Sequence, residues 1–211
     1  MSEPVFIFGT GGHARDVAEV VRSVGRTPVL VARGRIERDQ STSTDQIILE
    51  EVAVKNDGAD FAIGIGDNHG RARVAAAYPH LRFPAIMHPD ISLAQGQRTV
   101  INAARGTIVF AGVRMMAGVT VGAFCTFNLN ATLSHDCDFG DFVNLAPGAN
   151  VSGNVRIGRS AWIGAGAVIN QGTDTRKLEV GTNTIIGSGA VVLGDCLPHS
   201  VYVGNPARKI K

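Results

Sequence analysis

An apolar residue recurs every six positions through the second half of the chain, and this repeat constrains the fold more than any other feature. The series comprises Val109, Met115, Val121, Phe127, Leu133, Phe139, Leu145, Val151, Ile157, Ile163 and Ile169. A period of six is typical of a parallel β-helix, in which each unit supplies one short strand and one turn. Three units complete one triangular coil of roughly 18 residues, so residues that far apart stack on one another.

The repeat is interrupted once, after Ile169. It resumes at Val180-Gly181, Ile186-Gly187 and Val192, which is five residues late. We therefore expect residues 174–178 to form a loop that leaves the coil and returns to it. Cys125 and Cys137 occupy the small inward position of their units, which predicts core thiols rather than nucleophiles.

The first half of the chain alternates strand and helix patterns instead. Apolar runs predict strands at 5–8, 28–32 and 61–65, and helical spacing predicts helices at 14–24 and 71–78. Residues 34–46 are polar and aperiodic, which predicts a loop, and residues 47–54 are weakly helical. The prediction is a partial Rossmann-like α/β domain with three strands at 1–90, followed by the β-helix at 91–211.

A glycine turn follows the first predicted strand. Gly9, Gly11 and Ala14 satisfy the G-x-G-x-x-[G/A] fingerprint of dinucleotide-binding folds. The acidic residue that holds the ribose of NAD is missing after the second strand, where the chain reads Ala32-Arg33-Gly34-Arg35. Arginines there suit a 2′-phosphate, so an NADP oxidoreductase or a nucleotide sensor stays open beside other phosphate ligands.

Composition excludes several classes of partner. A net charge of +2 is too small for a nucleic-acid surface, and no apolar stretch is long enough to span a membrane. The three cysteines show no C-x-x-C spacing, so we expect reduced thiols and a cytoplasmic protein. The repeat region holds His135 but no other histidine before His199, which argues against a zinc site built from three histidines.

His135 and Asp136 follow Leu133 by two and three positions, at a corner of the coil where side chains face outward. Such a pair is either a solvated corner or an imidazole base oriented by a carboxylate. Gly153 lies 18 residues further on, so we expect it directly above His135. A glycine there leaves room beside the ring and exposes a backbone N–H.

Five motifs together resemble a known family: Gly11-Gly12-His13, Ile65-Gly66-Asp67-Asn68, Leu133-Ser134-His135-Asp136, "GANVSGNVRIG" and "VGNPARKI". They are similar to those of the hexapeptide-repeat sugar O- and N-acyltransferases, particularly the bacterial N-acetyltransferases of nucleotide-activated 4-amino sugars. The resemblance implies a left-handed parallel β-helix behind a nucleotide-sugar-binding domain. It also implies acetyl-CoA-dependent transfer to the amine of a nucleotide-linked 4-amino-4,6-dideoxy sugar, for polysaccharide or glycan synthesis.

The resemblance also assigns residues. It implies that His135 is the general base and Asp136 its orienting acid. The implied contacts to the sugar nucleotide are Gly11, Gly12, His13 and Gly66. The implied contacts to CoA are Asn144, Gly153, Ala165 and Ser188, in a groove between subunits of a homotrimer, with Gly204-Asn205-Pro206 near the adenine. Relatives often carry histidine where this chain has Asn144.

Three questions stay open at this level. The nucleotide is UDP, dTDP or GDP, because the residues after the second strand depart from the family pattern. The acceptor is an amine, or a hydroxyl as in the O-acetylation of sialic acid. The size of the acyl group is not determined by any motif.

Overall fold

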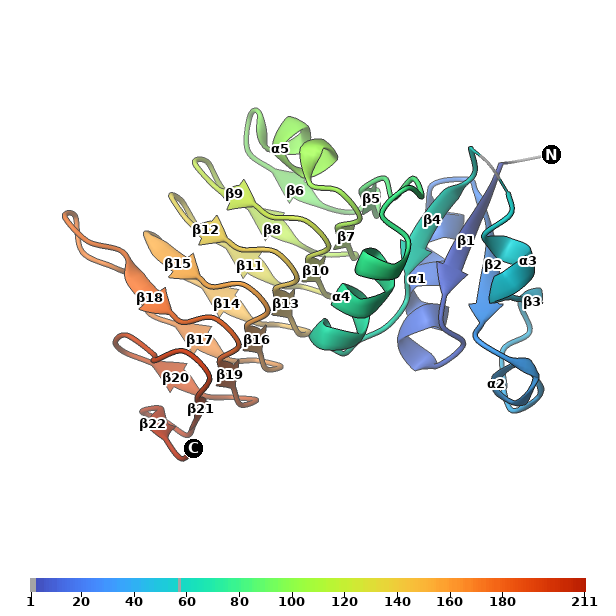
Figure 1. The fold of residues 1–211 in the computed structure, drawn as a ribbon. Helices are drawn as coiled ribbons and strands as arrows, with labels where there is room; N and C mark the ends of the chain where they lie inside the picture. The colour runs from blue at the N-terminus through green and yellow to red at the C-terminus, as the bar shows by residue number, and fades with distance from the viewer. Residues whose placement is uncertain (1–2, 57) are drawn as a thin grey trace.

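The computed structural model describes residues 3–56 and 58–211, which form a small α/β domain and a left-handed parallel β-helix (Figure 1). The N-terminal sheet has four parallel strands in the order β3-β2-β1-β4. These strands are β1 (Pro4–Phe8), β2 (Thr27–Ala32), β3 (Ile47–Leu49) and β4 (Asp60–Ile63). Its helices are α1 (Gly12–Ser23), α2 (Arg35–Asp39), α3 (Glu50–Ala53) and α4 (Asn68–Ala77).

Local sequence explains most of this domain. Val17, Val20 and Val21 are spaced on one face of α1 and are fully or almost fully buried in the same core as β1. Asp67 caps α4, since its carboxylate accepts a hydrogen bond from the backbone N–H of Gly70. The predicted strands and helices are therefore confirmed, with ends that differ by at most three residues.

Two predictions for the segment between β2 and β4 were only partly right. Residues 34–46 contain the short helix α2, and residues 47–54 begin with strand β3 before α3. Leu30 pairs with Ile47 and Ala32 with Leu49, so β3 is created by pairing with β2 rather than by its own pattern. The sheet consequently has four strands instead of three.

The β-helix is a triangular prism with three parallel faces. The eight-stranded face holds β5 (Ile86–Met87), β7 (Ile108–Val109), β10 (Thr126–Phe127), β13 (Asn144–Leu145), β16 (Trp162–Ile163), β19 (Ile185–Ile186), β21 (Val201–Val203) and the antiparallel β22 (Arg208–Lys209). The six-stranded face holds β6 (Ser92–Leu93), β8 (Arg114–Met115), β11 (Thr132–Leu133), β14 (Asn150–Val151), β17 (Val168–Ile169) and β20 (Val191–Val192). The four-stranded face holds β9 (Thr120–Val121), β12 (Asp138–Phe139), β15 (Val155–Ile157) and β18 (Leu178–Val180).

The register confirms the six-residue period. Leu133 pairs with Val151 in the next coil, 18 residues on, and the apolar series fills the interior of the prism. Beyond β17 the offset grows by five residues, since Ile169 pairs with Val192. The extra residues form the predicted loop, which projects from the prism ahead of β18 (Figure 1). Helix α5 (Gln97–Ala103) places Ile101 in the same core.

Arg71 of α4 joins the two units. Arg71 is 2% exposed, and its guanidinium donates to the backbone oxygens of Phe124 and Phe142, which belong to successive coils. It also donates to the carbonyl oxygen of Gly66 at 2.8 Å. Burial lowers the pKa of Arg71 to about 10, so it stays charged at neutral pH. This arginine therefore fixes the loop after β4 against the β-helix.

Candidate active site

The turn between β11 and β12 carries His135 and Asp136 on one edge of the prism, here called the His135 edge. Asp136 has φ 57°, a left-handed conformation that asparagine, aspartate and glycine tolerate best. Its carboxylate Oδ2 lies 2.9 Å from Nδ1 of His135. Both side chains are more than 60% exposed, at 62% and 65%. The carboxylate favours the tautomer with the proton on Nδ1, which leaves Nε2 as the acceptor.

Gly153 lies against this imidazole, as the 18-residue spacing predicts. A Cβ built on Gly153 would be 2.4 Å from Nε2 of His135, closer than atoms can approach. The backbone N–H of Gly153 donates to no carbonyl among the residues that the structure describes. His135 and Gly153 both line a cavity of about 510 Å³.

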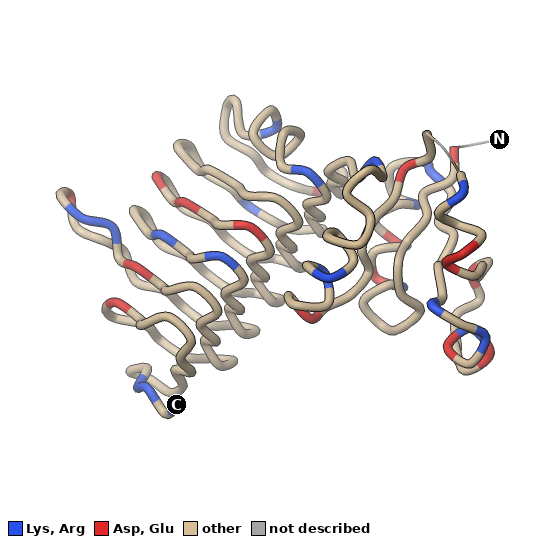
Figure 2. The backbone as a smooth tube through the Cα atoms, viewed as in Figure 1, with Lys and Arg blue, Asp and Glu red and all other residues tan. Residues whose placement is uncertain are grey.

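The projecting loop supplies the other wall of this cavity, through residues 171–174. Lys177, at the end of the loop, donates to the backbone oxygen of Asp136 and to the carboxylate of Asp138, both at 2.8 Å. Burial alone raises the pKa of Asp138, but hydrogen bonds from Lys177 and Thr120 lower it overall. Figure 2 shows basic residues on this loop and charges of both signs on the neighbouring four-stranded face. The sequence predicts the loop, but not that Lys177 anchors it to the His135 turn.

A second cavity, of about 350 Å³, lies at the carboxyl ends of the N-terminal strands. The structure brings together here all four residues expected to hold the sugar nucleotide: Gly11, Gly12, His13 and Gly66. The N-terminus of α1 opens into this cavity, and its free backbone N–H groups favour an anion.

His13 is not the exposed helix-terminal histidine that was one possibility. Its ring packs beside Phe110, with ring centroids 5.7 Å apart, and its Nε2 is buried without a partner among the described residues. Burial, with the nearby charge of Arg71, lowers the pKa of His13 from 6.5 to about 4. The imidazole is therefore neutral at pH 7, with one ring nitrogen still available.

Sequence reasoning missed two carboxylates and the role of one arginine at this cavity. Glu37 of α2 accepts from the Thr10 hydroxyl and the Arg33 backbone N–H, so it holds the glycine turn against the end of β2. Glu50 at the start of α3 and the Arg33 side chain line the same cavity. Both glutamates reach the site through α2 and β3, the elements that local pattern did not predict.

The remaining expected CoA contacts lie away from His135. Ala165 and Ser188 are exposed and stack in the turns between the eight-stranded and six-stranded faces, which we call the Ala165 edge. Asn144, in β13, is only 2% exposed. Within one chain, therefore, Gly153 is the only one of the four that joins His135.

In the described part of the chain, the cysteines are buried and no cluster of metal-ligating side chains is found. Cys125 and Cys137 are fully buried, as predicted for core residues, and burial raises the pKa of Cys125 to about 12. Within residues 3–56 and 58–211, His, Cys, Asp and Glu side chains form no group of three suited to a metal ion. Nor does any described helix have the length and apolar character needed to cross a membrane.

The sequence and the fold are similar to those of known proteins. Residues 4–78 match the PglD N-terminal domain. A GDP-perosamine N-acetyltransferase from Escherichia coli O157:H7 is 42% identical over 106 residues, which are 50% of this chain and 48% of that protein. The chain thus aligns with about half the length of this curated relative.

Two solved structures resemble the whole chain. The acetyltransferase domain of PglB from Neisseria gonorrhoeae FA1090, in complex with acetyl coenzyme A, has a TM-score of 0.84 at 26% identity and full coverage of both chains. PerB from Caulobacter crescentus, in complex with CoA and GDP-perosamine, has a TM-score of 0.79 at 26% identity, with 99% and 97% coverage. Over its whole length the chain is thus similar in fold to these acetyltransferases, and its N-terminal domain matches the PglD type.

Proposed function

We propose that the protein transfers the acetyl group of acetyl-CoA to the amine of a nucleotide-linked 4-amino-4,6-dideoxy sugar. The observation that carries this proposal is the His135–Asp136 pair beneath Gly153, in a cavity that lies apart from an anion-binding glycine turn. The acetyl-CoA complex of the gonococcal relative and the CoA–GDP-perosamine complex of the Caulobacter relative support the two substrates.

His135 acts as the general base. As the sugar amine attacks the thioester carbonyl, Nε2 of His135 takes the amine proton, and Asp136 stabilises the protonated ring through Nδ1–H. The C–S bond of the tetrahedral intermediate then breaks, the amide forms, and CoA leaves as the thiol with the proton that His135 returns. General-base catalysis of this kind is typically worth about a hundred- to ten-thousandfold in rate. No covalent bond to the enzyme forms, which agrees with the burial of the cysteines in this chain.

Gly153 contributes twice to the transfer. Its missing side chain leaves Nε2 accessible, and its backbone N–H donates to the oxygen on which negative charge develops. At the other site, the α1 N-terminus and the Gly11-Gly12 turn bind the diphosphate of the sugar nucleotide. Neutral His13 lines the same cavity, and we assign it a hydrogen bond to the same ligand.

CoA binds between subunits of a homotrimer. Ala165 and Ser188 lie on a different edge from His135, so one chain alone does not line the whole path of the pantetheine arm. A neighbouring subunit that presents its Ala165 edge to the His135 edge completes the groove. Three chains close such an arrangement with identical interfaces.

Release of CoA in the presence of nucleotide-linked 4-amino sugars tests this function. We expect turnover with an amino sugar, and none with the matched sugar in which a hydroxyl replaces the amine. His135→Ala should lower kcat by at least about a hundredfold while the Kd for acetyl-CoA changes little. Near-normal turnover by this variant would remove His135 from the mechanism, and turnover of the hydroxyl sugar alone would make the enzyme an O-acetyltransferase.

A further inference from the structure

The nucleotide cavity continues beyond the glycine turn into a smaller adjoining cavity of about 270 Å³. The two cavities share four lining residues, which are Arg33, Glu50, Ile65 and Val74. A ligand whose phosphates lie at the glycine turn therefore has a continuous path toward Glu50. This path rests on the function proposed above, which places a nucleotide at the turn.

The middle of the path is apolar. Phe8, Val31, Ile65 and Val74 line it, and Phe8 and Val31 are almost completely buried. Apolar walls with a few polar groups at the end suit a flat heterocyclic ring, because the ring loses contact with water and the end groups fix its orientation.

Glu50 lies at the end of the path, and only one of its carboxylate oxygens has a hydrogen-bond partner among the described residues. One oxygen of Glu50, Oε1, accepts a hydrogen bond from the hydroxyl of Tyr78, and among the described residues the other oxygen has no partner. This hydrogen bond, together with burial, raises the pKa of Tyr78 to about 12, so the tyrosine remains a donor at neutral pH. Tyr78 thus holds Glu50 in place, while Oε2 and the second lone pair of Oε1 stay available as acceptors.

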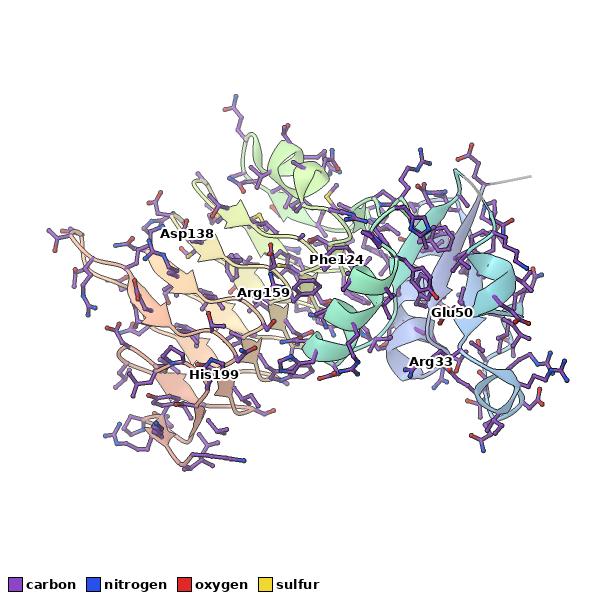
Figure 3. The ribbon with its side chains drawn as sticks, in the orientation of Figure 1. Arg33, Glu50, Phe124, Asp138, Arg159 and His199 are labelled. Carbon is purple, nitrogen blue, oxygen red and sulfur yellow. The ribbon has the colours of Figure 1, made fainter. Side chains whose placement is uncertain are left out.

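Arg33 faces the same space. Its guanidinium makes no hydrogen bond or ion pair within the described part of the chain, although it lines both cavities. Figure 3 labels Arg33 and Glu50 close to one another in the N-terminal domain. The site therefore offers one strong acceptor and one strong donor.

We propose that this cavity binds guanine, with Glu50 accepting from N1–H and the N2 amino group and Arg33 donating to O6 and N7. Guanidinium is the preferred partner of the O6/N7 edge of guanine, and carboxylates accept from base N–H groups. Uracil and thymine offer a carboxylate one N–H between two carbonyl oxygens, which repel it. Adenine presents the acceptor N1 where guanine has a donor. The substrate is therefore a GDP-linked sugar.

Calorimetric binding of GDP, IDP, UDP and dTDP to the full-length protein tests this assignment, without acetyl-CoA or sugar. IDP differs from GDP only in lacking the N2 amino group. We expect GDP to bind about tenfold tighter than IDP, and tighter still than UDP or dTDP. Glu50→Gln should remove the difference between GDP and IDP, because its amide cannot accept both hydrogen bonds at once with full strength.

Glu51→Gln is the matched control, since Glu51 is the exposed neighbour of Glu50 on α3 and lines neither cavity. If Glu50→Gln fails to fold, the wild-type comparison of GDP with IDP still decides. Equal affinity for GDP and IDP, or tighter binding of UDP or dTDP, would overturn the guanine assignment. Turnover of a UDP-linked amino sugar would then leave the acetyltransferase proposal intact, whereas no CoA release with any nucleotide sugar would refute that proposal separately.

Discussion

Gly153 lies against the imidazole of His135 so closely that a single added carbon would be 2.4 Å from Nε2. The glycine belongs to the coil above, 18 residues further along the chain, and its backbone is not in the left-handed region. The backbone conformation at position 153 is therefore compatible with alanine. The conflict is steric, between the added Cβ and the ring of His135.

Gly153→Ala should lower kcat by at least about a hundredfold, because its methyl group displaces the base from the position that proton transfer needs. Stability should change little, since the added methyl meets an exposed side chain that is free to rotate away. Steady-state kinetics and urea unfolding measure the two effects. Gly194→Ala is the control: it lies on the same edge with nothing within 4 Å of its Cβ. Normal kcat in Gly153→Ala would show that His135 tolerates displacement.

Mixed trimers should reveal a site shared between subunits. His135→Ala and Ala165→Trp each remove one side of the proposed CoA groove, so in the proposed homotrimer each variant alone should be nearly inactive. After the two variants are unfolded together and refolded, some interfaces combine an intact His135 edge with an intact Ala165 edge. We expect the mixture to regain activity well above the sum of the two parents. Parental activity in a refolded trimer would place the whole CoA site within one chain.

Lys177→Met should loosen the wall of the His135 cavity. The variant loses the hydrogen bond to the Asp136 backbone and the ion pair with Asp138, so the turn is held less firmly. We expect kcat/KM to fall roughly threefold to tenfold, because small misplacements of a catalytic group are costly. Nucleotide binding at the N-terminal site should be unaffected. Lys55→Met, exposed in the N-terminal domain, is the control, and equal losses in the two variants would contradict a role at the turn.

Stability should depend on pH through His13. The unfolded chain protonates this histidine below about pH 6.5, whereas the folded protein does so only near pH 4. Between these values the unfolded state binds more protons, so stability falls as the pH is lowered, by at most about 3 kcal/mol in total. His13→Gln should flatten urea unfolding free energies across this window. His69→Gln, at an exposed position on α4, should not.

The sequence by itself determined the β-helix and the placement of His135 beside Gly153. Because each coil repeats the one below it, the position of a residue within the six-residue unit predicts which face or turn of the coil it occupies. His135 beneath Gly153, and the five-residue interruption that becomes the projecting loop, could therefore be predicted without any tertiary information. The glycine turn could be predicted in the same way, because its backbone conformation and the dipole of the following helix depend on only a few neighbouring residues.

Only the tertiary structure decided what surrounds these groups. Glu37 and Glu50 reach the nucleotide cavity through a short helix and a strand that exist because β3 pairs with β2. The local sequence around Arg71 is that of an ordinary surface position on α4. In the structure, however, Arg71 is buried against two coils of the β-helix. Neither outcome follows from periodicity, because both depend on where segments distant in sequence meet and on which buried carbonyl oxygens need a donor.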